Sequence, residues 1–226
     1  MFRLWHTVCT GEVMAHGRAI VPITLPVLPE KPGWRGLHDA AAGCKACDLW
    51  KRGTQTVFGE GRVASKIMFV GEQPGNDEDL AEKPFVGPAG RLLDRALADA
   101  GIDRSLAYVT NVVKHFKWEP RGKRRIHAKP NAAEISACLP WLHAELDLIR
   151  PRVLVCLGAT AAQALLGRQF RVTAERGKFV ESALAPFVTA TVHPSSILRA
   201  PDEETRHAEM ARFIEDLKQV AKAIDL

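Results

Sequence analysis

The chain has 226 residues, of which 46% are hydrophobic and 25% are charged. This composition is typical of a soluble globular protein and excludes an intrinsically disordered chain. No apolar run approaches the ~20 residues that a membrane-spanning helix needs. The formal net charge of +5 indicates a mild attraction for polyanions and, taken alone, identifies no partner.

The cysteine pattern favours a metal or redox site over a secreted disulfide framework. Five cysteines are an odd number, and Cys44 and Cys47 form a C-x-x-C pair. The segment from Met1 to Cys9 lacks the unbroken apolar core of a secretory signal. We therefore expect a cytoplasmic protein in a reducing compartment, and a monomer without a membrane partner.

The first part of the chain differs from the rest. Residues 1–33 contain four prolines and show no sustained helical or strand periodicity. We predict a tail or linker over residues 1–33 and a single domain over residues 34–226. A chain of this length can bury roughly 70% of its unfolded surface, so the domain needs no disulfides.

Beyond residue 33, short β-rich apolar runs alternate with helical patterns. Such alternation favours a parallel sheet covered by helices. We predict an α/β fold, namely a three-layer α/β/α domain with a central four-stranded parallel sheet. The predicted strands are Lys66–Val70, Ala107–Val109, Val153–Leu157 and Phe187–Val192.

Three helices are readable from the spacing of their apolar residues. One ends at a stop signal at Gly101, and another carries apolar residues on one face from Ile135 to Ile149. A last helix begins near Glu203. Its predicted inner stripe is Phe213, Ile214, Leu217, Val220, Ala221 and Ile224.

Chemically distinctive segments follow all four predicted strands. Because ligands of open parallel sheets bind beyond the carboxyl ends of the strands, we expect these segments to line one crevice. Together they bring a carboxylate, an amide and an imidazole to it. The segments are Gly71-Glu72-Gln73-Pro74-Gly75, Thr110-Asn111-Val112-Val113-Lys114, Leu157-Gly158-Ala159 and His193-Pro194-Ser195-Ser196.

From about Cys44 to the C-terminal helix, the chain resembles the uracil-DNA glycosylase superfamily. The resemblance points to its iron-sulfur branch, the family 4 enzymes, and within that branch to the X-type enzymes (UdgX). The motifs are specific together and in this order, whereas each alone is weak. They are Gly71-Glu72-Gln73-Pro74-Gly75, Lys83-Pro84-Phe85-Val86-Gly87-Pro88-Ala89-Gly90-Arg91, Thr110-Asn111, Lys123-Arg124-Arg125-Ile126-His127 and His193-Pro194-Ser195-Ser196.

The resemblance implies an enzyme that excises uracil from DNA, with single-stranded DNA preferred. Asn111 then pairs with O4 and N3–H of uracil, Phe85 stacks on the extruded base, and His193 donates to O2. Each residue also has a structural interpretation. Phe85 could be core packing, His193 a helix-entry residue and Asn111 a cap or turn former.

The X-type resemblance also implies a nucleophile. Its loop brings His127 over the sugar, where the imidazole can form a bond to C1′ once uracil has left. Glu72 would accept the imidazole proton or orient the ring. We group Gln73 with these catalytic residues, and Gly71 and Ser195 with the substrate-binding ones.

A basic segment surrounds this histidine. Between Lys114 and Lys129 there are seven lysines and arginines against one acid, Glu119. Such a run is either a solvated, flexible loop or a surface that attracts phosphates, with salt-sensitive binding as the consequence. The predicted DNA-binding residues are Lys123, Arg124, Arg125 and Arg199.

The metal prediction combines spacing with the resemblance. Cys44, Cys47 and Cys138 are candidate ligands, and His115 stands where family 4 enzymes have a fourth cysteine. This Cys₃His set suits either zinc or an iron-sulfur cluster, and spacing alone does not separate them. The resemblance favours a structural 4Fe–4S cluster over zinc. We expect the remaining cysteines, Cys9 and Cys156, to be non-ligands.

Two rival functions stay open at this level. One is a turnover uracil glycosylase, in which His127 lies too far from the sugar and water completes the reaction. The other is a non-catalytic iron-sulfur or zinc protein that binds single-stranded DNA through its basic segment. Uracil release separates the second from the first, and a covalent protein–DNA adduct separates both from the X-type enzyme.

Overall fold

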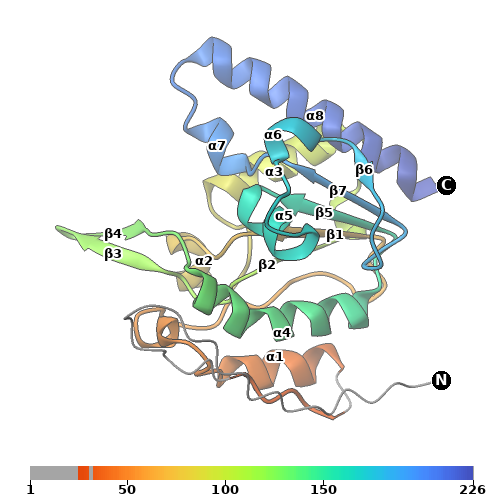
Figure 1. Ribbon diagram of the computed structural model, residues 1–226. Helices are drawn as coiled ribbons and strands as arrows, with labels where there is room; N and C mark the ends of the chain where they lie inside the picture. Colours follow the sequence, from red (N-terminus) through yellow and green to blue (C-terminus); the bar gives the residue numbers. More distant parts are fainter. Residues whose placement is uncertain (1–24, 31–32, 226) are drawn as a thin grey trace.

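The computed structural model describes residues 25–30 and 33–225. Its main sheet has five strands in the order β2-β1-β5-β7-β6 (Figure 1). The first four in this order are parallel to one another, which confirms the four predicted parallel strands to within two residues at each end. The strands are β1 Ile67–Gly71, β2 Ala107–Asn111, β5 Val153–Leu157, β6 Phe179–Val180 and β7 Phe187–Thr191.

The predicted number of four strands is wrong, because β6 adds a fifth. This strand pairs antiparallel with β7, with Phe179 opposite Thr189 and Val180 opposite Val188. The central sheet is therefore mixed rather than wholly parallel. A strand of two residues is too short to show the alternation by which a sequence reveals a strand.

Helices cover both faces of the sheet (Figure 1). The helix predicted to stop at Gly101 is α3, and the last helix begins at Glu203 as predicted. The helices are α1 Trp34–Ala42, α2 Asn76–Ala81, α3 Pro88–Asp99, α4 Ala132–Ile149, α5 Ala159–Leu166, α6 Val172–Glu175, α7 Pro194–Leu198 and α8 Glu203–Asp225, with 3₁₀ turns η1 Asp48–Lys51 and η2 Arg104–Leu106.

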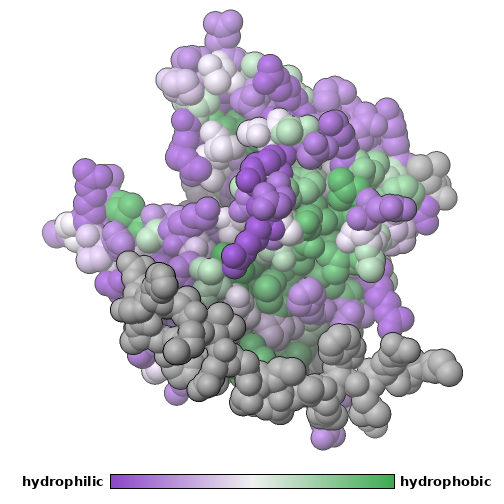
Figure 2. All heavy atoms as spheres, in the orientation of Figure 1, coloured by the Kyte–Doolittle hydropathy of each residue, from purple (hydrophilic) through white to green (hydrophobic). Residues whose placement is uncertain are grey.

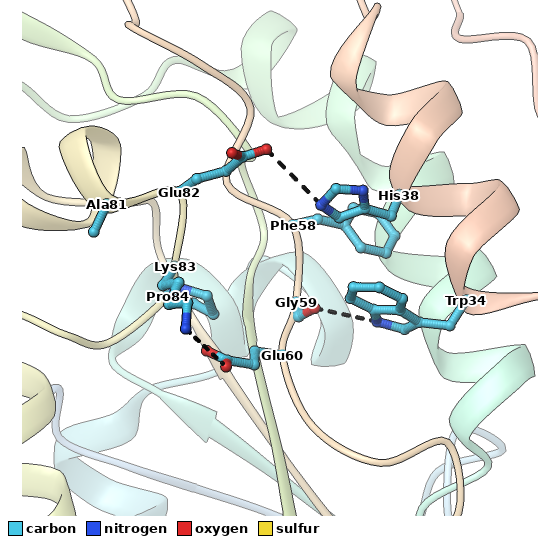
Figure 3. Close-up of a pocket in the computed structure, with 9 residues that line it drawn as sticks. All are labelled: Trp34, His38, Phe58, Gly59, Glu60, Ala81, Glu82, Lys83 and Pro84. Atoms are coloured by element: carbon cyan, nitrogen blue, oxygen red, sulfur yellow. Dashed lines mark hydrogen bonds and ion pairs between the residues drawn. The ribbon is translucent and has the colours of Figure 1, made fainter.

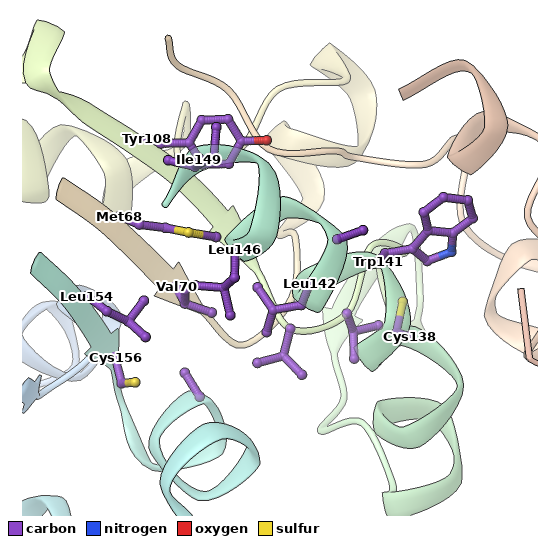
Figure 4. Close-up of a cluster of buried hydrophobic side chains, with 14 of the residues drawn as sticks. Met68, Val70, Tyr108, Cys138, Trp141, Leu142, Leu146, Ile149, Leu154 and Cys156 are labelled. Carbon is purple, nitrogen blue, oxygen red and sulfur yellow. The ribbon is translucent and has the colours of Figure 1, made fainter. Parts of the chain in front are cut away.

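Alternate residues of the strands supply two hydrophobic clusters, one on each face. Met68 and Val70 of β1 pack with α4 in the first cluster (Figure 4). Ile67 and Phe69 of the same strand pack with α3 and α8 in the second. This division follows from the two-residue period of a strand. It gives the predicted arrangement of helices on both sides of a sheet.

Helix α8 largely follows its predicted stripe. Phe213, Leu217, Val220 and Ile224 are buried, each worth roughly 1.5–3 kcal/mol when fully removed from water. Ile214 and Ala221, which were also predicted to belong to the stripe, are only partly buried. Ala223 is buried, although it was not predicted.

The segment predicted as a basic loop is a β-hairpin that projects from the body of the protein (Figure 1). Strands β3 Trp118–Arg121 and β4 Arg124–His127 pair antiparallel, with Trp118 opposite His127. The two-residue turn between them contains Gly122 at φ +60°, a conformation that glycine adopts at little cost. His127 therefore stands at the base of the hairpin, next to the body.

Hydrophilic side chains dominate the hairpin in the surface view, and hydrophobic ones gather in the middle of the same face (Figure 2). Among the described residues, no helix is both long and apolar enough to cross a membrane. Most of the predicted tail, namely residues 1–24, 31 and 32, lies outside the described residues, as does Cys9. The domain boundary at residue 34 stays a prediction.

Candidate active site

The carboxyl ends of the parallel strands meet at one edge of the sheet, as the sequence predicted. Gly71 ends β1 directly beside Asn111, the last residue of β2. Glu72 follows Gly71, and His193 follows β7 by two residues. The carboxylate, the amide and the imidazole therefore come to the same end of the sheet.

Close packing of Gly71, Phe85 and Asn111 forms the floor of the site. A Cβ atom on Gly71 would lie 2.4 Å from Asn111 Oδ1 and 2.8 Å from Phe85 Cζ. Only glycine leaves room for this approach. Asn111 is 2% exposed and Phe85 is 8% exposed, so the amide and the ring are fixed in a nearly dry environment.

Phe85 is held in an unusual backbone conformation. Its φ is +57°, which is uncommon for a bulky residue. Gly90 of α3 packs directly against it, since a Cβ there would lie 1.7 Å from the Phe85 carbonyl oxygen. The Phe85 ring belongs to the second hydrophobic cluster and also lies 6.0 Å from the His193 ring, centre to centre. Phe85 is therefore part of the core, and its stacking on an extruded base stays a prediction.

His193 is the N-cap of α7, and that role fixes its protonation state. Its Nδ1 accepts hydrogen bonds from the backbone N–H of Ser195 at 3.1 Å and from the Ser195 hydroxyl at 2.8 Å. The proton of the neutral ring therefore sits on Nε2, which is left as a donor. Ser195, predicted to bind substrate, acts here through the histidine.

The pKa of His193 is lowered to about 4, mainly by burial and also by the charges of Arg199 and of a protonated His127. His193 is therefore a neutral hydrogen-bond donor at pH 7. Gly158, with φ +87°, follows β5 and keeps the chain close, because a Cβ there would lie 3.0 Å from His193 Cβ.

Glu72 and His127 lie close together at this edge of the sheet. Glu72 Oε1 lies 3.5 Å from His127 Nε2, and Glu72 Oε2 accepts a hydrogen bond from the Thr160 hydroxyl. The His127 side chain is 49% exposed. Its pKa is lowered mainly by burial and also by Arg199, while Glu72 opposes the change. A neutral imidazole beside a carboxylate and open to solvent can act as a nucleophile or a base.

Gln73, predicted to be catalytic, instead holds the base of the hairpin. Its Nε2 donates to the carbonyls of Lys117 at 3.1 Å and Ala128 at 3.0 Å, and its Oε1 accepts from the Lys117 N–H at 3.1 Å. Residues 117 and 128 are the two ends of the hairpin. The amide is therefore occupied by backbone groups at the base of the hairpin, where His127 also lies.

Arg125 is likewise not a free DNA-binding residue. It donates to Asp79 Oδ2 at 2.6 Å and to Asn76 Oδ1 at 2.9 Å, and the Asp79 side chain is fully buried. An arginine held by a buried carboxylate is a structural anchor. The other predicted DNA-binding residues, Lys123, Arg124 and Arg199, are exposed.

The three predicted cysteine ligands lie near one another, between α1 and α4. Cys44 and Cys47 pack against the hydrophobic cluster that contains Cys138. The pKa of Cys138 is raised to about 12, mainly by burial. Cys138 Sγ accepts from the Lys114 N–H at 3.2 Å, and Cys44 Sγ from Trp141 Nε1 at 3.3 Å. Such N–H donors suit thiolate ligands.

His115, the fourth predicted ligand, is buried, and burial lowers its pKa to about 4. Thr56 Oγ1 gives its only proton to the Ala41 carbonyl at 3.0 Å, so it accepts from His115 Nε2 at 3.0 Å. That leaves the lone pair on Nδ1 for a metal, with the other nitrogen held as metal-bound histidines usually are. The residue types present, three thiols and an imidazole, are ones that iron-sulfur clusters and zinc accept.

Among the described residues, no three His, Cys, Asp or Glu side chains form a group arranged around one metal ion. The 4Fe–4S cluster therefore stays a prediction, and Cys44, Cys47, Cys138 and His115 are the residues that would hold it. Cys156 is fully buried inside β5, as predicted for a non-ligand.

Sequence reasoning missed a buried ion pair beneath the site. Lys114, which had been counted with the basic run, is 1% exposed and lies 2.5 Å from Glu145 Oε2. Its ammonium also donates to Thr110 Oγ1 at 2.6 Å and to the Asn111 carbonyl at 2.7 Å. The available signal was Glu145 itself, an acid between apolar residues on the buried face of α4.

A cavity of about 250 Å³ is lined by residues of α1 and of the segments 58–60 and 81–84 (Figure 3). Trp34 and His38 of α1 form one wall, with their rings stacked 5.0 Å apart. Glu60 and Lys83 form an ion pair at 3.8 Å across it. None of the predicted catalytic or substrate-binding residues lines this cavity.

Comparison with known proteins defines the class to which this fold and site belong. The family described as the uracil DNA glycosylase superfamily matches residues 58–218. That span covers β1 to β7 and most of α8, including every strand end described above. The chain belongs to the uracil-DNA glycosylase superfamily.

Within the superfamily, the chain is similar to proteins named type-4 uracil-DNA glycosylase. That of Thermotoga maritima is 37% identical over 182 residues, which are 80% of this chain and 89% of that protein. That of Pyrobaculum aerophilum is 37% identical over 172 residues, 73% and 84% of the two chains. That of Archaeoglobus fulgidus is 40% identical over 165 residues, which are 70% of this chain and 79% of that protein.

Proposed function

We propose that this protein is a uracil-DNA glycosylase, which cleaves the bond between uracil N1 and the deoxyribose C1′. The observation that carries the proposal is a neutral His193, with its donor on Nε2, beside the Gly71–Phe85–Asn111 floor. Membership of the superfamily and the names of the relatives support it.

The chemistry follows from where charge develops. The electron pair of the breaking bond moves to the base, and a neutral donor at O2 stabilises the resulting anion. The Asn111 amide offers an acceptor to N3–H and a donor to O4, a pattern that cytosine does not match. The Phe85 ring provides a face against which the extruded base can stack.

We further propose that the reaction ends in a covalent bond between His127 and C1′, as in the X-type branch. Three features support this step: the neutral imidazole, the carboxylate of Glu72 at 3.5 Å, and a hairpin anchored through Gln73 and Arg125. The lone pair of one imidazole nitrogen forms the bond to C1′. The proton on the other nitrogen then passes to Glu72 or to solvent.

The competing function is a turnover glycosylase, in which water attacks C1′. The partial exposure of His127 and the type-4 names of the relatives favour it. In both cases Cys44, Cys47, Cys138 and His115 would hold a 4Fe–4S cluster that joins the N-terminal region to α4. We also propose, from the sequence, a cytoplasmic monomer that prefers single-stranded DNA.

The test is a single-turnover reaction with a uracil-containing single-stranded oligonucleotide, in which free uracil and protein–DNA adduct are measured separately. We expect uracil release and a band shift that survives heat and detergent. His127→Ala should abolish the adduct and still release uracil. Release without any adduct in the unmodified protein would establish the turnover enzyme, and the absence of release would refute the glycosylase.

A further inference from the structure

Thr160 contacts the proposed catalytic carboxylate and comes from an element that the mechanism has not used. It lies in the first turn of α5, is 7% exposed, and donates its hydroxyl proton to Glu72 Oε2. The other oxygen of the same carboxylate, Oε1, lies 3.5 Å from His127 Nε2. The hydroxyl, the carboxylate and the imidazole thus form a chain that runs from α5 to the hairpin.

The backbone around Thr160 fixes it relative to the rest of the site. β5 ends at Leu157, and Gly158 turns the chain at φ +87° against His193 before α5 begins. A side chain at that glycine would be strained by its φ and would meet His193 Cβ at 3.0 Å. The position of Thr160 is therefore tied to the same strand ends that carry the other site residues.

The hydrogen bond of Thr160 is not explained by the needs of its own helix. Thr160 is the second residue of α5, so its own helix offers the hydroxyl no carbonyl three or four residues earlier. This hydroxyl instead leaves the helix and reaches the end of β1. A valine has the same shape and would fill the space as well, so packing alone does not require the hydroxyl.

We propose that Thr160 is a positioning residue that holds Glu72 so that its free oxygen faces His127. This inference rests on the proposed function, because it concerns the step in which His127 reacts. Glutamate has three rotatable side-chain bonds, and one fixed oxygen leaves the carboxylate few orientations. The bond to C1′ then forms from the imidazole lone pair, while the proton of the other ring nitrogen has an acceptor already in place.

The first test compares Thr160→Val, which keeps the shape, with Thr160→Ser, which keeps the hydroxyl. Single-turnover reactions measure the rate of uracil release and the fraction of events that end as adduct. Loss of a hydrogen bond to a charged group should slow adduct formation about tenfold or more in Thr160→Val. Uracil release should change much less, and Thr160→Ser should recover most of the adduct.

A matched control is Thr189→Val, because Thr189 is also buried and gives its hydroxyl proton to a protein acceptor, the Lys178 carbonyl. It should lose stability similarly to Thr160→Val, as measured by urea unfolding, without a change in the adduct fraction. Equal losses of release and adduct in Thr160→Val, or an unchanged adduct fraction, would overturn the proposal.

A second readout does not depend on the reaction. The ionisable groups that influence His127 are Glu72, which raises its pKa, and Arg199 and His193, which carry or acquire positive charge. Titration of DNA-free protein by NMR of labelled histidine should show a lower His127 pKa in Thr160→Val, in the direction given by Glu72→Gln. An unchanged His127 pKa would refute the positioning role. If the unmodified protein releases no uracil, the proposed function fails and this titration still decides on Thr160.

Discussion

Two neighbouring arginines of the hairpin should respond differently to replacement by alanine. Arg124 is exposed, whereas the Arg125 guanidinium is held by Asp79, Asn76 and Thr54. We therefore predict that Arg124→Ala weakens electrostatic binding to DNA. Arg125→Ala should instead destabilise the hairpin and leave the number of phosphate contacts unchanged.

The expected magnitudes follow from these contacts. Each phosphate neutralised on single-stranded DNA contributes about 0.7 to the slope of log affinity against log salt, so Arg124→Ala should reduce that slope by about 0.7. Arg125→Ala removes a hydrogen bond of 2.6 Å to a fully buried carboxylate. Hydrogen bonds to charged groups are worth roughly 1.5–3 kcal/mol, which is the loss expected in the free energy of unfolding.

Fluorescence anisotropy over a range of sodium chloride concentrations measures the slope. The oligonucleotide carries thymine in place of uracil, so that binding stays reversible and no adduct forms. Urea unfolding of the same variants measures stability. A slope that falls as much in Arg125→Ala as in Arg124→Ala would show that Arg125 leaves Asp79 to reach a phosphate, which contradicts the anchoring role.

Three further perturbations test the interior of the site. Lys114→Met leaves Glu145 buried and unpaired, so urea unfolding should show a loss of about 3–5 kcal/mol, and adding Glu145→Gln should recover much of it. Gly71→Ala places a Cβ 2.4 Å from Asn111 Oδ1, so single-turnover uracil release should fall at least about tenfold. His193 has a pKa of about 4 when folded and about 6.5 when unfolded. Its contribution to stability is therefore complete above pH 6.5 and is lost as the pH falls toward 4. His193→Asn should weaken this acid dependence in unfolding measured at pH 7 and pH 5.

The sheet and its site could be predicted because their signals are local. Each parallel strand is a short apolar run, and the residues at its end follow directly in the sequence. Gly71 and Asn111 meet because parallel strands end at one edge. The sequence therefore predicted that Glu72, Asn111 and His193 come to one edge of the sheet, and the structure brings them there.

The errors concern side chains whose partners are distant in the sequence. In the sequence, nothing distinguishes Arg125 from its neighbour Arg124. In the structure, Arg125 forms an ion pair with Asp79, which lies 46 residues earlier. Lys114 reads as part of a basic run because Glu145 lies 31 residues away on α4. The sequence around Gln73 does not indicate that its amide forms hydrogen bonds with both ends of a hairpin. Such pairings depend on tertiary contacts, which a local pattern does not encode.

The β3–β4 hairpin carries His127 outside the packed interior, since no residue from 117 to 128 belongs to either hydrophobic cluster. Its attachment includes polar contacts of Gln73 with its base and of Arg125, on β4, with Asp79 of the body. Evolution could therefore add, lengthen or delete this element without repacking the sheet. Under the proposed mechanism, this one hairpin decides whether each protein molecule turns over or stays bonded to the DNA strand on which it has acted.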